Sequence, residues 1–196
     1  DYKPNVDAVV WFVRHCWAAI RNVHPRAVFR IIGRSPAKRI QRLARLPGVQ
    51  VVGEVESVYD ELRSVDVSVA PLRIARGLQN KVLEAMAAAK PVVLTSGAAQ
   101  GIDATDGEHF LIADTPEATI RAVNRLLADP EERHAIGHAA RCFVGTNHCW
   151  ERELTKLEQI VTGVISTRIV RQHHLPAVTP TRRSAWIVPK PRSKPV

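Results

Sequence analysis

Residues 70–93 read APLRIARGLQNKVLEAMAAAKPVV and contain the clearest structural pattern in the chain. An apolar run over 67–70 is stopped by Pro71, and a basic loop then leads to Gly77. Apolar residues recur at helical spacing until Pro91 opens a second apolar run. The order is strand, loop, helix, turn, strand, which is the repeating unit of a parallel sheet. The loop therefore brings Gly77 and the first N–H groups of the helix to the carboxyl edge of that sheet.

The same alternation continues along the chain in both directions. We predict strands over 28–32, 49–52, 67–70, 91–94 and 109–113. Before, between and after them we predict, in chain order, a helix over 5–23 capped by Asn5, a helix over 36–46 capped by Ser35, a short helix capped by Ser57 and the helix after Gly77. Two helices opened by Thr115-Pro116 and Asp129-Pro130 and a helix over about 150–164 complete the pattern. This pattern predicts an α/β fold, a Rossmann-like, doubly wound parallel sheet with helices on both faces.

The charge is unevenly distributed. The net charge of +9, from 28 Lys and Arg against 19 Asp and Glu, suggests an anionic partner when the chain is taken as a whole. After Glu158, however, there are seven basic residues, five prolines and no acidic residue, the composition of a disordered extension. Without those seven, 21 basic residues face 19 acidic ones. We expect a nearly neutral domain over 1–164 and a basic tail over 165–196.

The remaining composition excludes several classes of protein. Three cysteines in 196 residues are too few and too scattered for a disulfide framework, which favours a reducing compartment. No apolar run approaches the roughly 20 residues that span a bilayer. The chain begins with Asp1, and its only methionine is Met86. We therefore expect a fragment, or a processed piece, of a longer protein.

The helix after Gly77 carries the residues with the clearest chemistry. Its first N–H groups favour an anion such as a diphosphate, and Lys81 adds a positive charge there. Glu84 lies on the same face, where its carboxylate can accept hydrogen bonds from a ribose diol, while Leu83 and Met86 are expected to face the sheet. The alternative is an amphipathic helix on which Lys81 and Glu84 form an exposed pair.

Residues 70–93 resemble the most recognisable motif of the GT-B glycosyltransferases of family 4, the group 1 glycosyltransferases. In that motif a Gly-containing loop opens a helix that reads Leu-Glu-Ala-Met-Ala and is followed by Pro-Val-Val. The combination with Pro-Leu-Arg, Arg-Gly and Gln-Asn-Lys is closest to bacterial sugar transferases associated with exopolysaccharide and exosortase (PEP-CTERM) systems. The resemblance extends from Tyr2 to near Trp150. It implies the donor-binding C-terminal half of a two-domain enzyme, with the acceptor-binding domain and the first strand of this domain before Asp1.

The resemblance also implies roles for individual residues. Glu84 matches the second glutamate of the family's Glu-x7-Glu motif, which holds the ribose of the donor. This chain has Arg76 where the first glutamate usually stands, and we expect Arg76 to approach a phosphate or an acidic sugar. The implied residues on the ribose and base side are Glu84, Gly33, Arg34, Gly53, Glu54 and Val55. On the diphosphate and sugar side they are Arg76, Gly77, Leu78, Gln79, Asn80, Lys81 and Asn5.

The resemblance implies a hexosyltransferase-type enzyme that retains anomeric configuration and moves a sugar from a nucleotide diphosphate sugar to a saccharide or lipid-linked acceptor in exopolysaccharide biosynthesis. No cofactor or metal is expected, and no catalytic residue is assigned. We expect a cytoplasmic protein, with peripheral contact at the inner face of the bacterial membrane as an option. Nucleic acid is not an expected partner.

Other functions remain open at this point. The absence of G-x-G-x-x-G and of a Walker loop argues against a dinucleotide oxidoreductase and an NTPase. A non-catalytic nucleotide-binding domain and a plain structural module share the fold, and the tail, with Trp186-Ile187-Val188, could bind an anionic surface or nucleic acid. His134, His138, Cys142, His148 and Cys149 include metal-ligating residue types, but they do not follow a standard ligand spacing.

Overall fold

The computed structural model describes residues 2–148, 154–155 and 158–162. The chain divides into one unit over 1–153 and a second over 154–196. The described residues of the second unit are helical. The predicted tail over 165–196 and much of the predicted helix over 150–164 lie outside the described residues.

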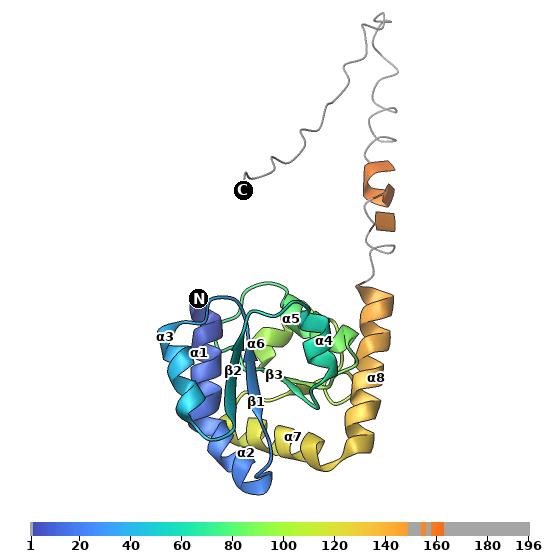
Figure 1. The fold of residues 1–196 in the computed structure, drawn as a ribbon. Coiled ribbons are helices and arrows are strands. Elements are labelled where there is room, and N and C mark those ends of the chain that lie inside the picture. The colour runs from blue at the N-terminus through green and yellow to red at the C-terminus, as the bar shows by residue number, and fades with distance from the viewer. Residues whose placement is uncertain (1, 149–153, 156–157, 163–196) are drawn as a thin grey trace, which may run out of the picture. The chain divides into compact units, whose positions relative to one another are not determined.

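The first unit alternates helices with strands, as Figure 1 shows. Its strands are β1 (Phe29–Ile32), β2 (Val49–Gly53), β3 (Ser68–Ala70), β4 (Val92–Leu94) and β5 (Leu111–Ile112). Its helices are α1 (Lys3–Phe12), the π-helical η1 (Val13–Trp17), α2 (Ala18–Val23), α3 (Lys38–Gln41), the 3₁₀-helical η2 (Arg42–Arg45), α4 (Val58–Arg63), α5 (Asn80–Ala87), α6 (Ser96–Ala99), α7 (Pro116–Ala128) and α8 (Pro130–Asn147).

All paired strands are parallel, which confirms the predicted α/β fold class. They form two sheets rather than one continuous sheet: β1 pairs with β2, and β4 lies between β3 and β5. Phe29 is in register with Val49, and Ser68 with Val92. Among the described residues no strand joins β1 to β3.

Helices cover both faces, and the side chains of β4 divide between two apolar clusters. Val93 packs in a cluster with Phe12 and other side chains of α1, η1 and α7. Val92 and Leu94 point the other way, into a cluster with Met86 of α5. Because successive side chains of a strand face opposite sides, this alternation places α1 and α7 on one face and α5 on the other.

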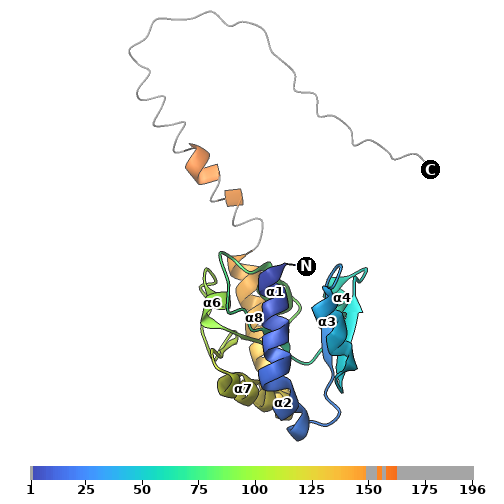
Figure 2. The same ribbon diagram turned by 90° about the vertical axis from the view of Figure 1, so that its left-hand side faces the viewer.

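The first helical segment runs without interruption from Lys3 to Val23, and its middle turn is π-helical. Figure 2 shows α1 and α2 along one continuous course. Near the end of η1, Trp17 Nε1 donates a hydrogen bond to the carbonyl of Pro47 at 3.0 Å. This bond ties the helix to the turn that precedes β2.

Three predicted helix caps are confirmed. The hydroxyl of Ser57 accepts from the N–H of Asp60, and that of Thr115 accepts from the N–H of Ala118. The carboxylate of Asp129 accepts from the backbone N–H groups of Glu131 and Glu132 in the first turn of α8. Each cap satisfies a backbone donor that a helix N-terminus otherwise leaves without a partner.

Two other predicted caps are wrong. Asn5 lies inside α1, because the helix starts at Lys3 and the N–H of Asn5 already bonds to the Tyr2 carbonyl at 3.0 Å. Ser35 has φ +49°, whereas an N-cap needs an extended backbone, and α3 starts later, with Ala37 as its N-cap. The predicted helix over 36–46 is therefore reduced to α3 followed by one 3₁₀ turn.

Candidate functional site

The loop before α5 is held by hydrogen bonds between the side chain of Gln79 and the backbone of the loop itself. Gly77 has φ +65°, a conformation that favours glycine, and an added Cβ there would meet no atom within 4 Å. Gln79, the N-cap position, donates from its amide to the carbonyls of Arg76 and Gly77 at 3.2 and 3.0 Å. Its side chain thus bonds back into the loop instead of capping α5.

This arrangement leaves the N-terminus of α5 open. The N–H groups of Val82 and Leu83 bond to the Gln79 carbonyl, whereas those of Asn80 and Lys81 come before the first hydrogen bonds within the helix. The helix buries Val82, Ala85 and Met86, while Leu83 is only half-buried. The expectation for Met86 is therefore confirmed, and Leu83 packs against the same cluster from a half-buried position.

Lys81 is positioned by α1. Its ammonium Nζ donates to Asn5 Oδ1 at 2.7 Å, so a side chain 76 residues away in sequence holds the cation beside the start of α5. The residue as a whole is exposed, but protein atoms around the ammonium desolvate it, and this lowers the pKa of Lys81. The negative charge of Glu84 raises that pKa and so opposes part of the effect of desolvation. An anion next to Lys81 would relieve the cost of desolvation.

A second contact between α1 and the same loop was not anticipated from the sequence. Arg73 donates two hydrogen bonds to the carboxylate of Asp7, at 3.1 and 2.9 Å. These bonds lower the pKa of Asp7 below its usual range. No local sequence signal links the two residues, because their contact depends on α1 lying next to the end of β3. Asp7 and Asn5 thus attach the first turns of α1 to both ends of the loop.

The side chains of Glu84, Lys81 and Asn5 reach one cavity of about 390 Å³. Gly33, at the end of β1, also lines it. Glu84 additionally lines a neighbouring hollow of about 300 Å³, together with Tyr59 of α4. A carboxylate, an ammonium and a helix N-terminus therefore surround one space at the carboxyl edge of the strands, where sheets of this kind bind ligands.

The loops that follow β1 and β2 contact each other. The N–H of Gly33 donates to the Gly53 carbonyl at 2.8 Å, and Arg34 Nε lies 2.9 Å from Glu54 Oε1. Gly53 has φ +85°, and Val55 behind it is half-buried. The structure therefore brings these predicted residues together as a pair of joined loops, of which Gly33 reaches the cavity.

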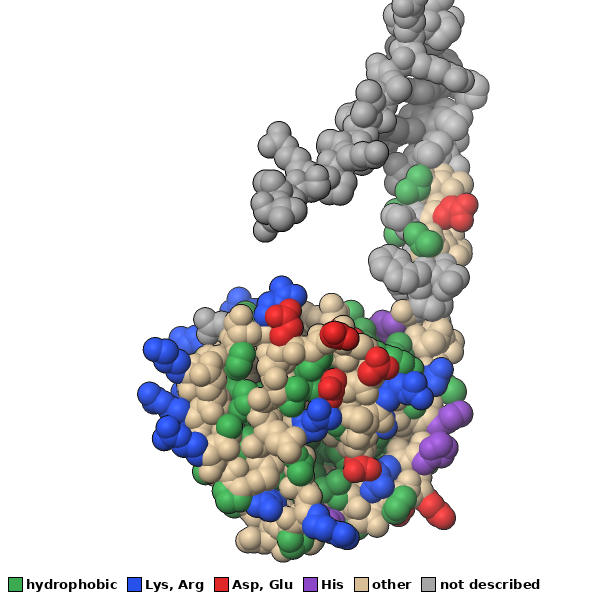
Figure 3. All heavy atoms as spheres, in the orientation of Figure 1, with side chains coloured by type: hydrophobic (Ala, Val, Ile, Leu, Met, Phe, Trp, Pro, Cys, Tyr) green, Lys and Arg blue, Asp and Glu red, His purple; other side chains and the backbone are tan. Residues whose placement is uncertain are grey.

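Not every predicted residue lies on that cavity. Arg76, Gly77 and Leu78 are exposed and do not line it, and Asn80 is exposed at the first position of α5. Many of the basic side chains lie elsewhere: Figure 3 shows Lys and Arg gathered on the side where α3 lies, which carries Lys38, Arg39, Arg42 and Arg45 of α3 and η2. Among the described residues, the cationic side chains that line the cavity are Lys81 of α5 and Arg30 of β1, and none of the four on α3 and η2 reaches it.

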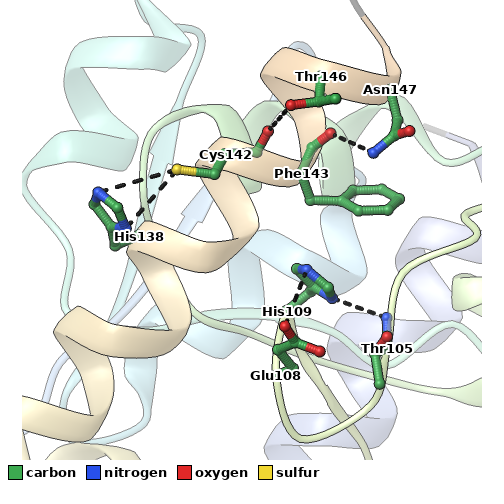
Figure 4. A network of polar contacts seen from close by, with 8 residues as sticks. All are labelled: Thr105, Glu108, His109, His138, Cys142, Phe143, Thr146 and Asn147. Atoms are coloured by element: carbon green, nitrogen blue, oxygen red, sulfur yellow. Dashed lines mark hydrogen bonds and ion pairs between the residues drawn. The ribbon is translucent and has the colours of Figure 1, made fainter.

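The histidine and cysteine residues of α8 do not assemble a metal centre. Figure 4 shows the sulfur of Cys142 beside His138, at 3.8 Å from Nδ1, whereas His109 is held separately by the N–H of Thr105. Among residues 2–148, 154–155 and 158–162, no group of three His, Cys, Asp or Glu side chains could hold a metal ion. Cys149 lies outside the described residues.

Within the described part of the chain, no helix combines the length and the apolar character that crossing a bilayer requires.

One family model matches most of this chain. Residues 1–129 match the family model described as "Glycosyl transferases group 1". The curated "Glycosyltransferase 1 domain-containing protein 1" of Xenopus tropicalis is 23% identical over 124 residues, which are 63% of this chain and 36% of that protein. This chain therefore spans little more than a third of that relative.

Solved structures show the same fold. Sucrose-phosphate synthase from Thermosynechococcus elongatus superposes with a TM-score of 0.69 at 21% identity, over 85% of this chain and 44% of that one. Anabaena HepE, solved in complex with UDP, superposes with a TM-score of 0.59 at 14% identity, over 78% and 45% of the two chains. The model match covers well over half of the sequence, and the chain belongs to the group 1 glycosyl transferases.

Proposed function

We propose that this chain is the donor-binding half of a family 4 GT-B glycosyltransferase. The enzyme transfers a sugar, with retention of anomeric configuration, from a nucleotide diphosphate sugar to a saccharide or lipid-linked acceptor in exopolysaccharide biosynthesis. Base and ribose lie toward Glu84 and the joined loops that carry Gly33 and Gly53. The diphosphate lies at the start of α5, beside Lys81.

One observation carries this proposal. Lys81, held by Asn5 at 2.7 Å, and Glu84 line the same cavity at the carboxyl edge of the strands. A cation and a helix N-terminus favour a diphosphate, while a carboxylate one turn further on can accept hydrogen bonds from a ribose diol. An exposed Lys81–Glu84 pair explains the geometry less well, because the hydrogen bond of Lys81 goes to Asn5.

The same groups supply the chemistry that a departing nucleoside diphosphate needs. As the bond between sugar and phosphate breaks, negative charge grows on the diphosphate. The backbone N–H groups of Asn80 and Lys81, together with the ammonium of Lys81, are fixed dipoles and charge aimed at that region, and such preorganised groups stabilise developing charge without reorganisation. Exposed Arg76 is near enough in sequence to add a further cation when the donor is bound.

The solved neighbours support a nucleotide sugar as the ligand, since HepE was solved in complex with UDP and with UDP-glucose. This chain spans under half of HepE and of sucrose-phosphate synthase. We therefore expect this chain alone to bind a nucleotide weakly and to transfer no sugar, because acceptor contacts lie elsewhere in a two-domain enzyme.

Isothermal titration calorimetry with UDP, GDP and ADP sugars tests the assignment, with the longest natural protein that contains this chain. Glu84→Ala should weaken binding by about tenfold or more, because hydrogen bonds to a charged group contribute roughly 1.5–3 kcal/mol each. Glu84→Gln should weaken binding less, because the oxygen of its side-chain amide still accepts hydrogen bonds. Glu131→Ala, on the first turn of α8, is the matched control and should leave the affinity unchanged.

The outcomes separate the alternatives. Absence of nucleotide binding, or equal affinity of Glu84→Ala and the parent, contradicts the proposed site. Binding of a nucleotide sugar without transfer to any saccharide acceptor would instead identify a non-catalytic nucleotide-binding protein.

A further inference from the structure

Positive and negative charge are separated within the part of the chain that is nearly neutral as a whole. Residues 8–53, which run from α1 to β2, contain nine Lys and Arg and no Asp or Glu. Residues 54–158 contain eleven Lys and Arg against seventeen Asp and Glu. Positive charge is therefore concentrated on the first elements of the chain, and Figure 3 shows it on the side where α3 lies.

The helical segment of α3 and η2 carries the densest group of these cations. We call this group the cationic face, and its members are Lys38, Arg39, Arg42 and Arg45. All four side chains are exposed, whereas Ile40 between them is buried and Leu43 packs against the apolar cluster of α1. Lys38, Arg42 and Arg45 are spaced four and three positions apart, which places them on one side of the segment.

The described part of the chain supplies no carboxylate that pairs with this face. Other arginines have such a partner: Arg30 pairs with Glu61 at 2.7 Å, and Arg73 with Asp7 at 2.9 Å. None of the four cations forms an ion pair among the described residues. Arg39 acts on Asp7 only through its charge, and that carboxylate already accepts two hydrogen bonds from Arg73. The charge of the face is therefore not balanced by these residues.

Helix stability does not explain the four cations. Positive charge is favourable near the C-terminus of a helix, which accounts for Arg42 and Arg45 in the last turn of the segment. Lys38 and Arg39, however, are the first two residues of α3, where the helix dipole disfavours positive charge. Like charges four residues apart, such as Lys38 and Arg42, also repel each other. An anionic partner would remove both unfavourable contributions.

Exposed aliphatic side chains lie at the end of the cationic face. Leu46 follows Arg45 directly and is 43% exposed, and Val23 at the end of α2 is 60% exposed. The hydrogen bond from Trp17 to the Pro47 carbonyl attaches the helix that ends at Val23 to the turn after Leu46. Cations beside exposed aliphatic groups are typical of surfaces that bind to the headgroup region of a bilayer.

The same residues fit a nucleic acid less well. Proteins bind single strands largely by stacking bases on aromatic side chains, and phosphate contacts gain nothing from an exposed leucine. The tryptophan and phenylalanine side chains of α1 and η1, which lie beside α3, are all buried. Charge and apolar exposure together therefore favour a lipid surface.

We propose that the cationic face, together with Leu46 and Val23, docks the first unit on an anionic lipid surface. The four cations contact lipid phosphates, and the aliphatic side chains enter the boundary between headgroups and acyl chains. None of the four cations lines the cavity beside Lys81, so docking leaves that cavity accessible to a soluble ligand. This surface lies in the folded unit and is distinct from the basic tail.

Co-sedimentation with lipid vesicles tests the proposal, using the longest natural protein that contains this chain and no nucleotide. The vesicles contain phosphatidylcholine, either alone or mixed with phosphatidylglycerol as the anionic lipid. The parent should bind the anionic vesicles much more tightly than the neutral ones. Lys38→Gln combined with Arg42→Gln should weaken binding to anionic vesicles by about tenfold or more, because each basic residue near such a surface contributes roughly fivefold.

Arg63→Gln combined with Arg141→Gln is the matched control, since it removes the same charge. Both arginines are exposed, on α4 and α8, and these helices pack against the apolar cluster of α5 and not against that of α1. This control should bind anionic vesicles like the parent. Leu46→Ser should weaken vesicle binding by about threefold or more, because less apolar surface is then buried, and should not affect binding to a DNA duplex.

The outcomes distinguish a lipid surface from other anions. Equal binding of the Lys38 and Arg42 double variant and the parent to anionic vesicles would overturn the proposal, because another segment, such as the tail, would then hold the lipid. Equal binding of the parent to neutral and anionic vesicles would also overturn it. Binding to a DNA duplex that depends on Lys38 and Arg42, without vesicle binding, would identify a nucleic acid instead. Because no nucleotide sugar is added, these results are independent of the Glu84 experiment.

Discussion

A methyl group added at Gly137 should destabilise the packing that supports the site. Gly137 lies in the middle of α8, where this helix packs against α5. A Cβ at this position would lie 2.2 Å from the carbonyl oxygen of Ala89 and 2.9 Å from its carbonyl carbon. Both atoms are backbone, and the turn is held by the Ala89 N–H bond to Met86 at 2.9 Å. The overlap can therefore be relieved only by moving α8 away from α5.

The size of the effect follows from two opposing contributions. Forcing additional atoms into a packed interface costs about 1–3 kcal/mol, and contact with backbone atoms places this case at the upper end. Alanine is favoured over glycine within a helix by about 1 kcal/mol, which offsets part of that cost. Gly137→Ala should therefore lower the free energy of unfolding by about 2 kcal/mol, or roughly thirtyfold in the folding equilibrium.

Urea unfolding followed by circular dichroism measures this change, and an unchanged slope shows that stability alone is affected. Gly145→Ala in the same helix is the matched control, because an added Cβ there meets no atom within 4 Å. This control should be as stable as the parent or up to about 1 kcal/mol more stable. Two variants with equal stability would refute the inferred close approach of α8 to α5.

Three further predictions concern other parts of the first unit. Ala89 has φ +56° after the end of α5, so Ala89→Gly should raise the free energy of unfolding by about 1 kcal/mol in the same urea assay. Hydrogen bonds from Arg73 lower the pKa of Asp7, so this pair stabilises the fold above the usual carboxyl pKa of 3.8 and is lost as the pH falls through the folded-state value. Asp7→Asn should thus lower the free energy of unfolding by less than about 1 kcal/mol at pH 7, because the pair is partly exposed. Near pH 2 the substitution should leave the free energy of unfolding almost unchanged. Burial raises the pKa of the Cys16 thiol to about 11, so iodoacetamide at pH 8 should modify exposed Cys142 and spare Cys16, as peptide mass spectrometry would show.

Local patterns predicted the elements well wherever the deciding interactions are local. The caps at Ser57, Thr115 and Asp129 need only a side-chain oxygen two or three residues before a backbone donor. Asn5 was misjudged for the opposite reason: the same amide oxygen that suits an N-cap is taken by Lys81, 76 residues later in the chain. A side chain with a distant partner cannot be assigned from its neighbours in sequence.

The order of helices and strands can be read from the sequence, and with it the parallel pairing of the strands and the edge at which Lys81 and Glu84 emerge. This information is contained in apolar spacing and turn residues, which act over a few positions. Three features come from tertiary packing alone: α1 holds Lys81 through Asn5, Arg73 pairs with Asp7, and β1 and β3 line one cavity. Those features depend on which surfaces pack together, because packing joins residues that no local pattern relates.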